Sequence, residues 1–344
     1  MKTKLKVESY KLKVGFSGVC NFVFAVVFSS LPLLPSNLFA AQLGGQAGAF
    51  SRMGLGADRV AMGDCGVAMT GAGMNWYYNP AGLAYQRDRQ VSLGYRWMSL
   101  DRKMMYIGFT TPLKGNAAVG FGYVRAATDN IDARDSNGEH FDMLSNSDNL
   151  LHATFALMPH KRVSLGVSLK WFIGSVPTIL DDNKTLYGYG MGVDLGVRIV
   201  AADNLSFGLQ VRDINAKYTW DATKVWNDGL GSKDDLFPLM TRLGVAYDPR
   251  ADLTLTSDLV VNGSDIGESS DAFDLHFGGE WRKAFDRNKN LAFRAGWNGD
   301  SPVFGLGVDL GLRYGIKARM DYSYLIEKVA PTGSHLIGWT FKLD

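Results

Sequence analysis

The residues that could perform catalysis or hold a metal ion are few and scattered along the chain. No spacing such as His-Glu-x-x-His joins the five histidines, which are His140, His152, His160, His276 and His335. No Gly-x-Ser-x-Gly nucleophile elbow occurs either. A hydrolase in a barrel wall could pair His152 or His276 with a serine, but the sequence pairs neither with a nucleophile. We therefore expect no catalytic residue, no metal site and no cofactor, and we expect that the protein is not an enzyme.

Two other features could carry chemistry. Cys65 is the only cysteine after residue 40, so the chain beyond that point cannot form an internal disulfide. A lone cysteine is usually a small buried side chain, with a reactive thiol as the alternative. Gly54-Leu55-Gly56 resembles the start of a dinucleotide-binding loop, but no strand precedes it and the third glycine is missing.

The first 40 residues have the order of a secretory signal peptide. Five lysines precede an apolar stretch over residues 14–34, and small residues follow at Ala40 and Ala41. We predict cleavage after Ala40, with a retained membrane anchor as the alternative. Removal of this segment, which holds five Lys and one Glu, leaves 31 basic and 33 acidic residues. Such a balance leaves no basic footprint for nucleic acid.

From residue 90 onward the chain alternates apolar residues with small or polar ones. In residues 163–171, for example, Val, Leu and Trp alternate with Ser, Gly and Lys, which places the two sets on opposite faces of a strand. The same pattern predicts fourteen strands, at residues 90–98, 103–112, 116–126, 149–158, 161–172, 185–198, 203–213, 239–248, 251–261, 272–282, 289–297, 302–313, 316–326 and 334–343. Most have the ~9–12 residues that a tilted strand needs to cross a bilayer.

The connections and the two strand faces indicate a membrane barrel. Even-numbered connections are short, whereas several odd-numbered ones are long, notably residues 127–148 and 214–238. Short turns on one side and long loops on the other are typical of outer-membrane barrels. Charged residues share one face, and lipid would host them only at a cost of ~2–4 kcal/mol for a basic residue. We therefore predict an all-β fold, a 14-stranded antiparallel transmembrane β-barrel over residues 90–344 with a polar lumen.

Residues 41–89 are rich in Gly, Ala and Met and show little strand periodicity. Asn79 can cap a short helix that starts at Pro80. A fourteen-stranded lumen is too wide for its own side chains to fill, so we expect this N-terminal segment to lie inside as a plug. The candidate plug motif consists of Gly54, Gly56, Met62, Gly63, Asn79, Pro80, Ala81 and Gly82.

These motifs carry a family resemblance. The Gly-x-Gly-Ala run, Met-Gly-x-x-Gly-Val-Ala and Asn-Pro-Ala-Gly-Leu resemble the N-terminal region of PorV/PorQ-type outer-membrane proteins, within the FadL-like (long-chain fatty-acid channel) superfamily. The resemblance implies fourteen strands and an N-terminal plug. Gly338, Phe341 and Leu343 also resemble the C-terminal signal that the barrel-assembly machinery recognises.

Two functions follow from the resemblance. The first is the passage of a hydrophobic small-molecule ligand across a bacterial outer membrane, with outer-membrane lipid around the barrel. The second is a PorV-like role in type IX secretion, binding exported cargo or secretion-complex proteins through the outer loops. Tyr218, Trp220 and Trp226 give the loop at residues 214–238 an aromatic surface for the ligand or the partner.

Overall fold

The computed structural model describes residues 45–71, 73–177, 185–221, 223, 231–263, 273–286, 289–312, 316–327 and 332–343. Within these ranges no helix has both the length and the apolar character needed to cross a membrane. The predicted signal peptide lies outside the described residues, so its cleavage after Ala40 stays a prediction.

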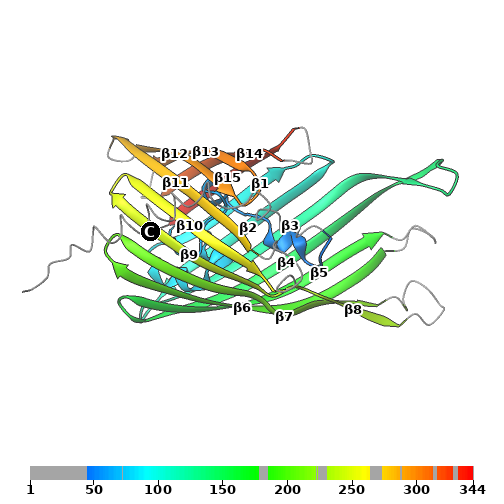
Figure 1. Cartoon of the computed structure of the whole chain (residues 1–344), viewed down its shortest axis with the longest axis horizontal. Helices are drawn as coiled ribbons and strands as arrows, with labels where there is room; N and C mark the ends of the chain where they lie inside the picture. Colours follow the sequence, from blue (N-terminus) through cyan, green and yellow to red (C-terminus); the bar gives the residue numbers. More distant parts are fainter. Residues whose placement is uncertain are drawn as a thin grey trace, which may run out of the picture. The chain divides into compact units, whose positions relative to one another are not determined.

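The described strands form a single antiparallel sheet that closes on itself (Figure 1). Each strand of the barrel pairs with its neighbours in sequence, β15 pairs with β1, and β7 pairs with both β6 and β9. The strands are β1 (Arg89–Trp97), β2 (Arg102–Leu113), β3 (Ala117–Arg134), β4 (His140–His160), β5 (Val163–Pro177), β6 (Thr185–Ala202), β7 (Leu205–Asp221), β8 (Ser232–Leu236), β9 (Met240–Arg250), β10 (Leu253–Asn262), β11 (Phe273–Asp286), β12 (Lys289–Asn298), β13 (Pro302–Gly311), β14 (Lys317–Leu325) and β15 (Ser334–Leu343).

Fourteen of these strands make the barrel wall, which confirms the predicted fold class. The fifteenth, β8, is a short addition that pairs only with the end of β7. Closure gives every wall strand a paired neighbour on both sides. A bilayer requires this pairing because it offers no water to bond the backbone instead.

The wall has the two faces that the alternation predicts. Outward residues are large and apolar and lie exposed on the barrel surface, among them Leu93, Ile107, Phe109, Phe121, Phe155, Leu165, Leu195, Phe207, Leu243, Phe293, Phe304 and Leu306. Inward residues are polar or charged and are buried, among them Arg96, Lys170, Asp194, Arg212, Arg242, Asp258, Arg294 and Asp321. A belt of exposed apolar side chains around a closed barrel is the surface that lipid covers.

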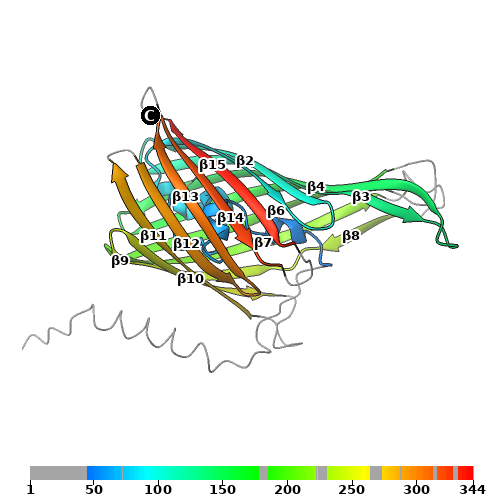
Figure 2. The same ribbon diagram turned by 90° about the horizontal axis from the view of Figure 1, so that it is seen from above.

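The prediction of long loops at residues 127–148 and 214–238 is wrong in part. The strands β3 and β4 continue as a paired hairpin to Arg134 and His140, and β7 continues to Asp221. Both views show the β3–β4 hairpin projecting beyond the other strands (Figures 1 and 2). The alternation marks only strands with one lipid-facing side. These extensions lie beyond the apolar belt, and their exposed positions mix polar residues with apolar ones such as Phe141 and Met143.

The N-terminal segment folds into four short helical turns inside the barrel, the blue ribbon in Figure 2. They are η3 (Ala49–Arg52), α2 (Ala57–Val60), α3 (Asn75–Tyr78) and η4 (Pro80–Tyr85). As predicted, the Asn79 side chain caps η4 by accepting a hydrogen bond from the Ala81 N–H. We call residues 45–71 and 73–85 the plug segment.

Candidate functional site

The plug segment lies directly against glycines on the inner face of the wall. A Cβ atom placed on Gly166 would come 2.3 Å from the carbonyl carbon of Pro80, and one on Gly208 would come 2.2 Å from the carbonyl oxygen of Val67. Real Cβ atoms do not approach that closely, so side chains at these positions would displace the plug segment. The glycines that alternate along the strands therefore make room for the plug backbone.

Polar wall residues hold the same backbone by hydrogen bonds. One carboxylate oxygen of Asp258 on β10 accepts from the N–H groups of Gly66 and Val67, at 2.9 and 3.2 Å. The His276 ring, through Nδ1, lies 2.7 Å from the carbonyl oxygen of Gly63. Because these groups are buried, each bond satisfies a plug amide or carbonyl that water cannot reach.

Asn79 is fully buried and joins the plug segment to itself and to the wall. Its Nδ2 donates to the carbonyl oxygen of Val67 at 2.7 Å and to that of Val197 on β6 at 3.1 Å. Pro80 then lies against Gly166, and the Gly82 carbonyl accepts from the Asn75 side chain at 3.3 Å. These contacts assign the Asn-Pro-Ala-Gly run to anchoring, since all four residues are buried.

A bulge in β7 brings a second set of charges into the lumen. The register between β6 and β7 shifts twice near Val193, and Asp213 adopts φ 61°. Consecutive residues Arg212 and Asp213 can therefore both point inward and be buried. Lys170 forms ion pairs with Asp213 and, at 2.6 Å, with Asp194, while Arg212 donates to the carbonyl oxygen of Ser51 in the plug segment at 2.6 Å.

Above this network, toward the long connections, aromatic rings fill the inside of the barrel. Phe172 on β5 packs edge-on against Phe237 at 4.7 Å between ring centres and against Tyr218 at 6.1 Å. Phe50 of the plug segment completes the group, and the Tyr218 hydroxyl donates to Asp148 at 2.8 Å. We call Phe50, Phe172, Tyr218, Trp220 and Phe237 the aromatic cluster. It forms an apolar layer between the long connections and the plug segment.

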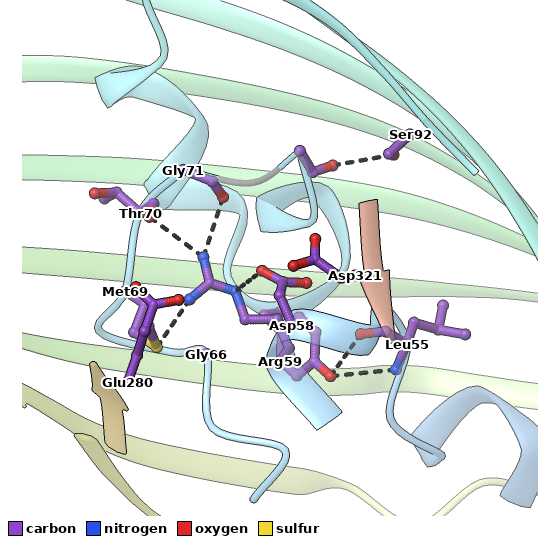
Figure 3. Close-up of polar contacts among 12 residues, drawn as sticks. Leu55, Asp58, Arg59, Gly66, Met69, Thr70, Gly71, Ser92, Glu280 and Asp321 are labelled. Atoms are coloured by element: carbon purple, nitrogen blue, oxygen red, sulfur yellow. Dashed lines mark hydrogen bonds and ion pairs between the residues drawn. The ribbon is translucent and has the colours of Figure 1, made fainter. Parts of the chain in front are cut away.

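At the opposite end, near the short turns, the lumen keeps a polar cavity of about 260 Å³. Arg59 forms part of its lining. The Arg59 guanidinium donates to the carbonyl oxygens of Thr70 and Gly71, at 3.3 and 3.0 Å (Figure 3). The same group contacts the Met69 sulfur at 2.8 Å and lies 3.6 Å from Asp58. Arg59 therefore fixes the plug loop that borders the cavity.

Comparisons with known proteins identify the fold. No protein-family model and no curated sequence matches the chain. Solved structures match, among them the toluene transporter TbuX of Ralstonia pickettii, at 13% identity and a TM-score of 0.56 over 84% of this chain and 98% of TbuX. The toluene transporter TodX of Pseudomonas putida matches at 13% identity and a TM-score of 0.57, over 84% of this chain and 97% of TodX.

A FadL homologue of Pseudomonas aeruginosa matches at 10% identity and a TM-score of 0.50, over 83% of this chain and 96% of that one. The barrel has the FadL-like fold. Together with the exposed apolar belt, this fold makes the chain a transmembrane β-barrel of the bacterial outer membrane. The finer resemblance to PorV/PorQ-type proteins has no counterpart among these matches.

Within this FadL-like barrel, the predicted plug-motif glycines lie at tight places in the plug segment. Gly56 has φ 76° and precedes α2, and a Cβ atom on Gly54 would come 2.4 Å from an Asp64 carboxylate oxygen. Gly63 has φ 73° and lies against the carbonyl oxygens of Phe277 and Trp297. Met62 is buried and also lines the polar cavity.

The predicted aromatic surface in the loop at residues 214–238 needs correction. Tyr218 and Trp220 lie on β7, and both rings belong to the inward-facing aromatic cluster. Beyond the apolar belt the alternation is inverted, so apolar rings face inward while Lys217 and Thr219 face outward and bond to Asp234 of β8. Trp226 lies outside the described residues.

Sequence reasoning missed three members of the aromatic cluster, Phe50, Phe172 and Phe237. They come from three distant segments, and no spacing along the chain connects them. Phe172 alone carried a signal, because it follows Ser168 and Lys170 on the inward face of the predicted strand. As to metals, the described residues contain no group of His, Cys, Asp and Glu side chains that could hold an ion.

Proposed function

We propose that this FadL-like barrel passes hydrophobic small molecules across the outer membrane. The observation that carries the proposal is the aromatic cluster, an apolar layer inside the barrel between the long connections and the plug segment. Aromatic rings bind apolar ligands through their faces and edges, and such rings are common in ligand sites. The toluene transporters TbuX and TodX share the barrel fold, which makes toluene a suitable first probe.

In this proposal the plug segment closes the lumen between ligands. A ligand displaces the packed rings of the aromatic cluster and then passes beside the plug segment toward the polar cavity at the short-turn end. The plug backbone donates hydrogen bonds to Asp258 and accepts them from His276 and Arg212, and these bonds keep the barrier in place. The membrane is then crossed without a continuous open pore.

The test is the uptake of labelled toluene by a Gram-negative host that lacks its own channel for hydrophobic compounds. We expect the chain to raise uptake above the empty vector, and Phe172→Gln to lower it several-fold, because an amide replaces an apolar ring of the aromatic cluster. The matched control is Phe141→Gln, which changes an exposed ring at the tip of the β3–β4 hairpin. Uptake equal to that of the empty vector would refute the proposal.

A second function, PorV-like binding of exported cargo, is favoured by the β3–β4 hairpin. Among the described residues, β5 pairs with β4 only from Ser147 onward and β2 pairs with β3 only as far as Thr128. Over residues 131–144, neither outer edge of the hairpin pairs with another described strand, and Phe141 and Met143 are exposed. Open strand edges can pair with an extended segment of another protein.

Removal of the hairpin tip distinguishes the two functions. A variant in which Gly-Asn replaces residues 131–144 should keep toluene uptake if the barrel is a channel. If the hairpin binds cargo, the same variant should lose proteins that co-purify with the wild-type chain in mild detergent, as identified by mass spectrometry. Identical co-purifying proteins in both samples would argue against cargo binding through the hairpin.

A further inference from the structure

Two cavities open side by side in the lumen near the short turns, and basic residues connect them. One has a volume of about 260 Å³ and the other about 310 Å³. Arg282, Arg319 and Lys342 line both cavities, and Lys317 lines the second. Four basic side chains from three strands, β11, β14 and β15, thus converge on one space.

The register places two of these charges directly against each other. Lys317 on β14 pairs with Lys342 on β15, so their side chains leave opposed positions on the same inward face. Directly opposed residues of an antiparallel pair have Cβ atoms ~4.5–5.5 Å apart, and like charges there destabilise the sheet. Many other inward positions of the wall hold small residues. The fold therefore does not require lysines at these two paired positions.

Two of the carboxylates that line these cavities are already bonded to arginines. Asp309 accepts from Arg319 at 2.5 Å and from Asn290 at 3.2 Å, and Glu280 accepts from Arg282 at 2.5 Å. Neither Lys317 nor Lys342 forms an ion pair with a carboxylate in the part of the chain that the structure describes. At the far side of the first cavity, the buried Arg198 keeps one guanidinium nitrogen, Nη1, without a hydrogen-bond partner among the described residues.

We infer that this end of the barrel binds an oxyanion, the phosphate or carboxylate group of a small molecule or of a lipid headgroup. The two lysines supply point charges for it. Arg319 gives Nε and Nη2 to Asp309, which leaves its Nη1 as the donor for the bound anion. A bound anion offsets the repulsion between Lys317 and Lys342, which accounts for their opposed positions. We call Lys317, Lys342, Arg319 and Arg282 the oxyanion site. The inference does not depend on transport of hydrophobic compounds.

The test is calorimetric titration of the purified full-length chain in non-ionic detergent. The probes are sodium phosphate, sodium succinate, and phosphatidylglycerol in mixed micelles, each at an ionic strength matched with NaCl. We expect saturable binding that weakens by about tenfold or more in the Lys317→Gln/Lys342→Gln double variant, because each lysine supplies a charged hydrogen bond. The matched control is Lys161→Gln, in an exposed turn at the same end of the barrel.

The three probes separate the sources of the oxyanion. Binding of phosphate or succinate identifies a free anion, whereas binding of phosphatidylglycerol alone identifies a headgroup. Heats that match NaCl for all three probes, or equal affinity in the wild type and the double variant, would overturn the inference. Heat-modifiable mobility on gels confirms that each variant is folded, so a lost signal cannot come from a barrel that failed to assemble.

Discussion

At the scale of single residues, the plug segment is fitted to the wall by positions that accept no side chain. Gly63 is the tightest of the predicted motif, because a Cβ atom there would come 2.4 Å from the carbonyl oxygens of both Phe277 and Trp297. Its φ of 73° is in addition one that most residues with a side chain adopt only at a cost. Two independent physical reasons therefore favour glycine at this position.

We expect Gly63→Ala to displace the plug segment and leave the barrel intact. A strained φ alone costs ~1–3 kcal/mol, and the contact with two wall carbonyls adds to it. The measurement is the ionic conductance of single barrels in a planar bilayer, which should rise as the plug segment shifts. Gly71→Ala is the matched control, because Gly71 has φ 88° but no atom within 4 Å of its Cβ position. Equal conductance in the two variants would show that the wall contact is unimportant.

Cys65 behaves as a core residue. The side chain is fully buried beside Asp258, and burial raises the pKa of the thiol well above its ordinary range. Since the thiolate is the reactive form, we expect no labelling by a maleimide at pH 8 in the folded barrel and complete labelling in denaturant. Mass spectrometry of the intact chain gives the extent. Rapid labelling of the folded protein would favour the alternative of a reactive thiol.

At the scale of the elements, the plug loop after α2 depends on one arginine. The buried Arg59 binds the backbone of Thr70 and Gly71, and no other side chain bonds to either carbonyl within the described residues. The bonds between the wall and residues 63–68 fix the start of the loop, so Arg59 controls its end. Because different residues hold the two ends of the loop, a substitution of Arg59 tests the end of the loop alone.

We expect Arg59→Met to loosen residues 69–71 and to leave the strands unchanged. Methionine fills a similar space without donating hydrogen bonds, so those backbone carbonyls lose their partners. Hydrogen exchange with mass spectrometry should show faster exchange around the loop. Peptides from β10 and β11 are the internal reference, and unchanged exchange in the loop would contradict this role of Arg59.

At the scale of the whole molecule, strand parity sets the orientation. Transmembrane barrels place their long connections outside the cell and their short turns in the periplasm. The β3–β4 hairpin and the aromatic cluster then lie at the outer end, and the oxyanion site lies at the periplasmic end. A ligand crossing inward would meet apolar rings first and basic side chains last.

Cysteine labelling in a Cys65→Ser background tests this orientation. Asn137→Cys, at the tip of the β3–β4 hairpin, should react with a membrane-impermeant maleimide on intact cells. Lys161→Cys, in the turn between β4 and β5, should react only after the outer membrane is permeabilised. The opposite labelling pattern would show that the barrel has the reverse orientation, with the oxyanion site at the cell surface.

Much of this architecture follows from the sequence alone. Side chains on a strand alternate with period two, and a bilayer requires one face of the strand to be apolar. Every transmembrane strand therefore shows alternating apolar and polar residues in the sequence. That physical necessity explains why the fourteen strands and the inward charges could be predicted. The capping role of Asn79 could be predicted for a local reason, because Asn precedes a proline that suits the first helical position. Beyond the edge of the membrane no side of a strand has to be apolar. The extensions of β3, β4 and β7 therefore lack the alternation by which the other strands could be predicted.

Contacts between segments that are far apart in the chain could be seen only in the tertiary structure. The register between β14 and β15 set Lys317 against Lys342, and barrel closure brought Phe50, Phe172 and Phe237 together. The inward direction of Tyr218 likewise depends on its place beyond the apolar belt. No local periodicity encodes such contacts, because each is fixed by how the whole sheet closes around the plug segment.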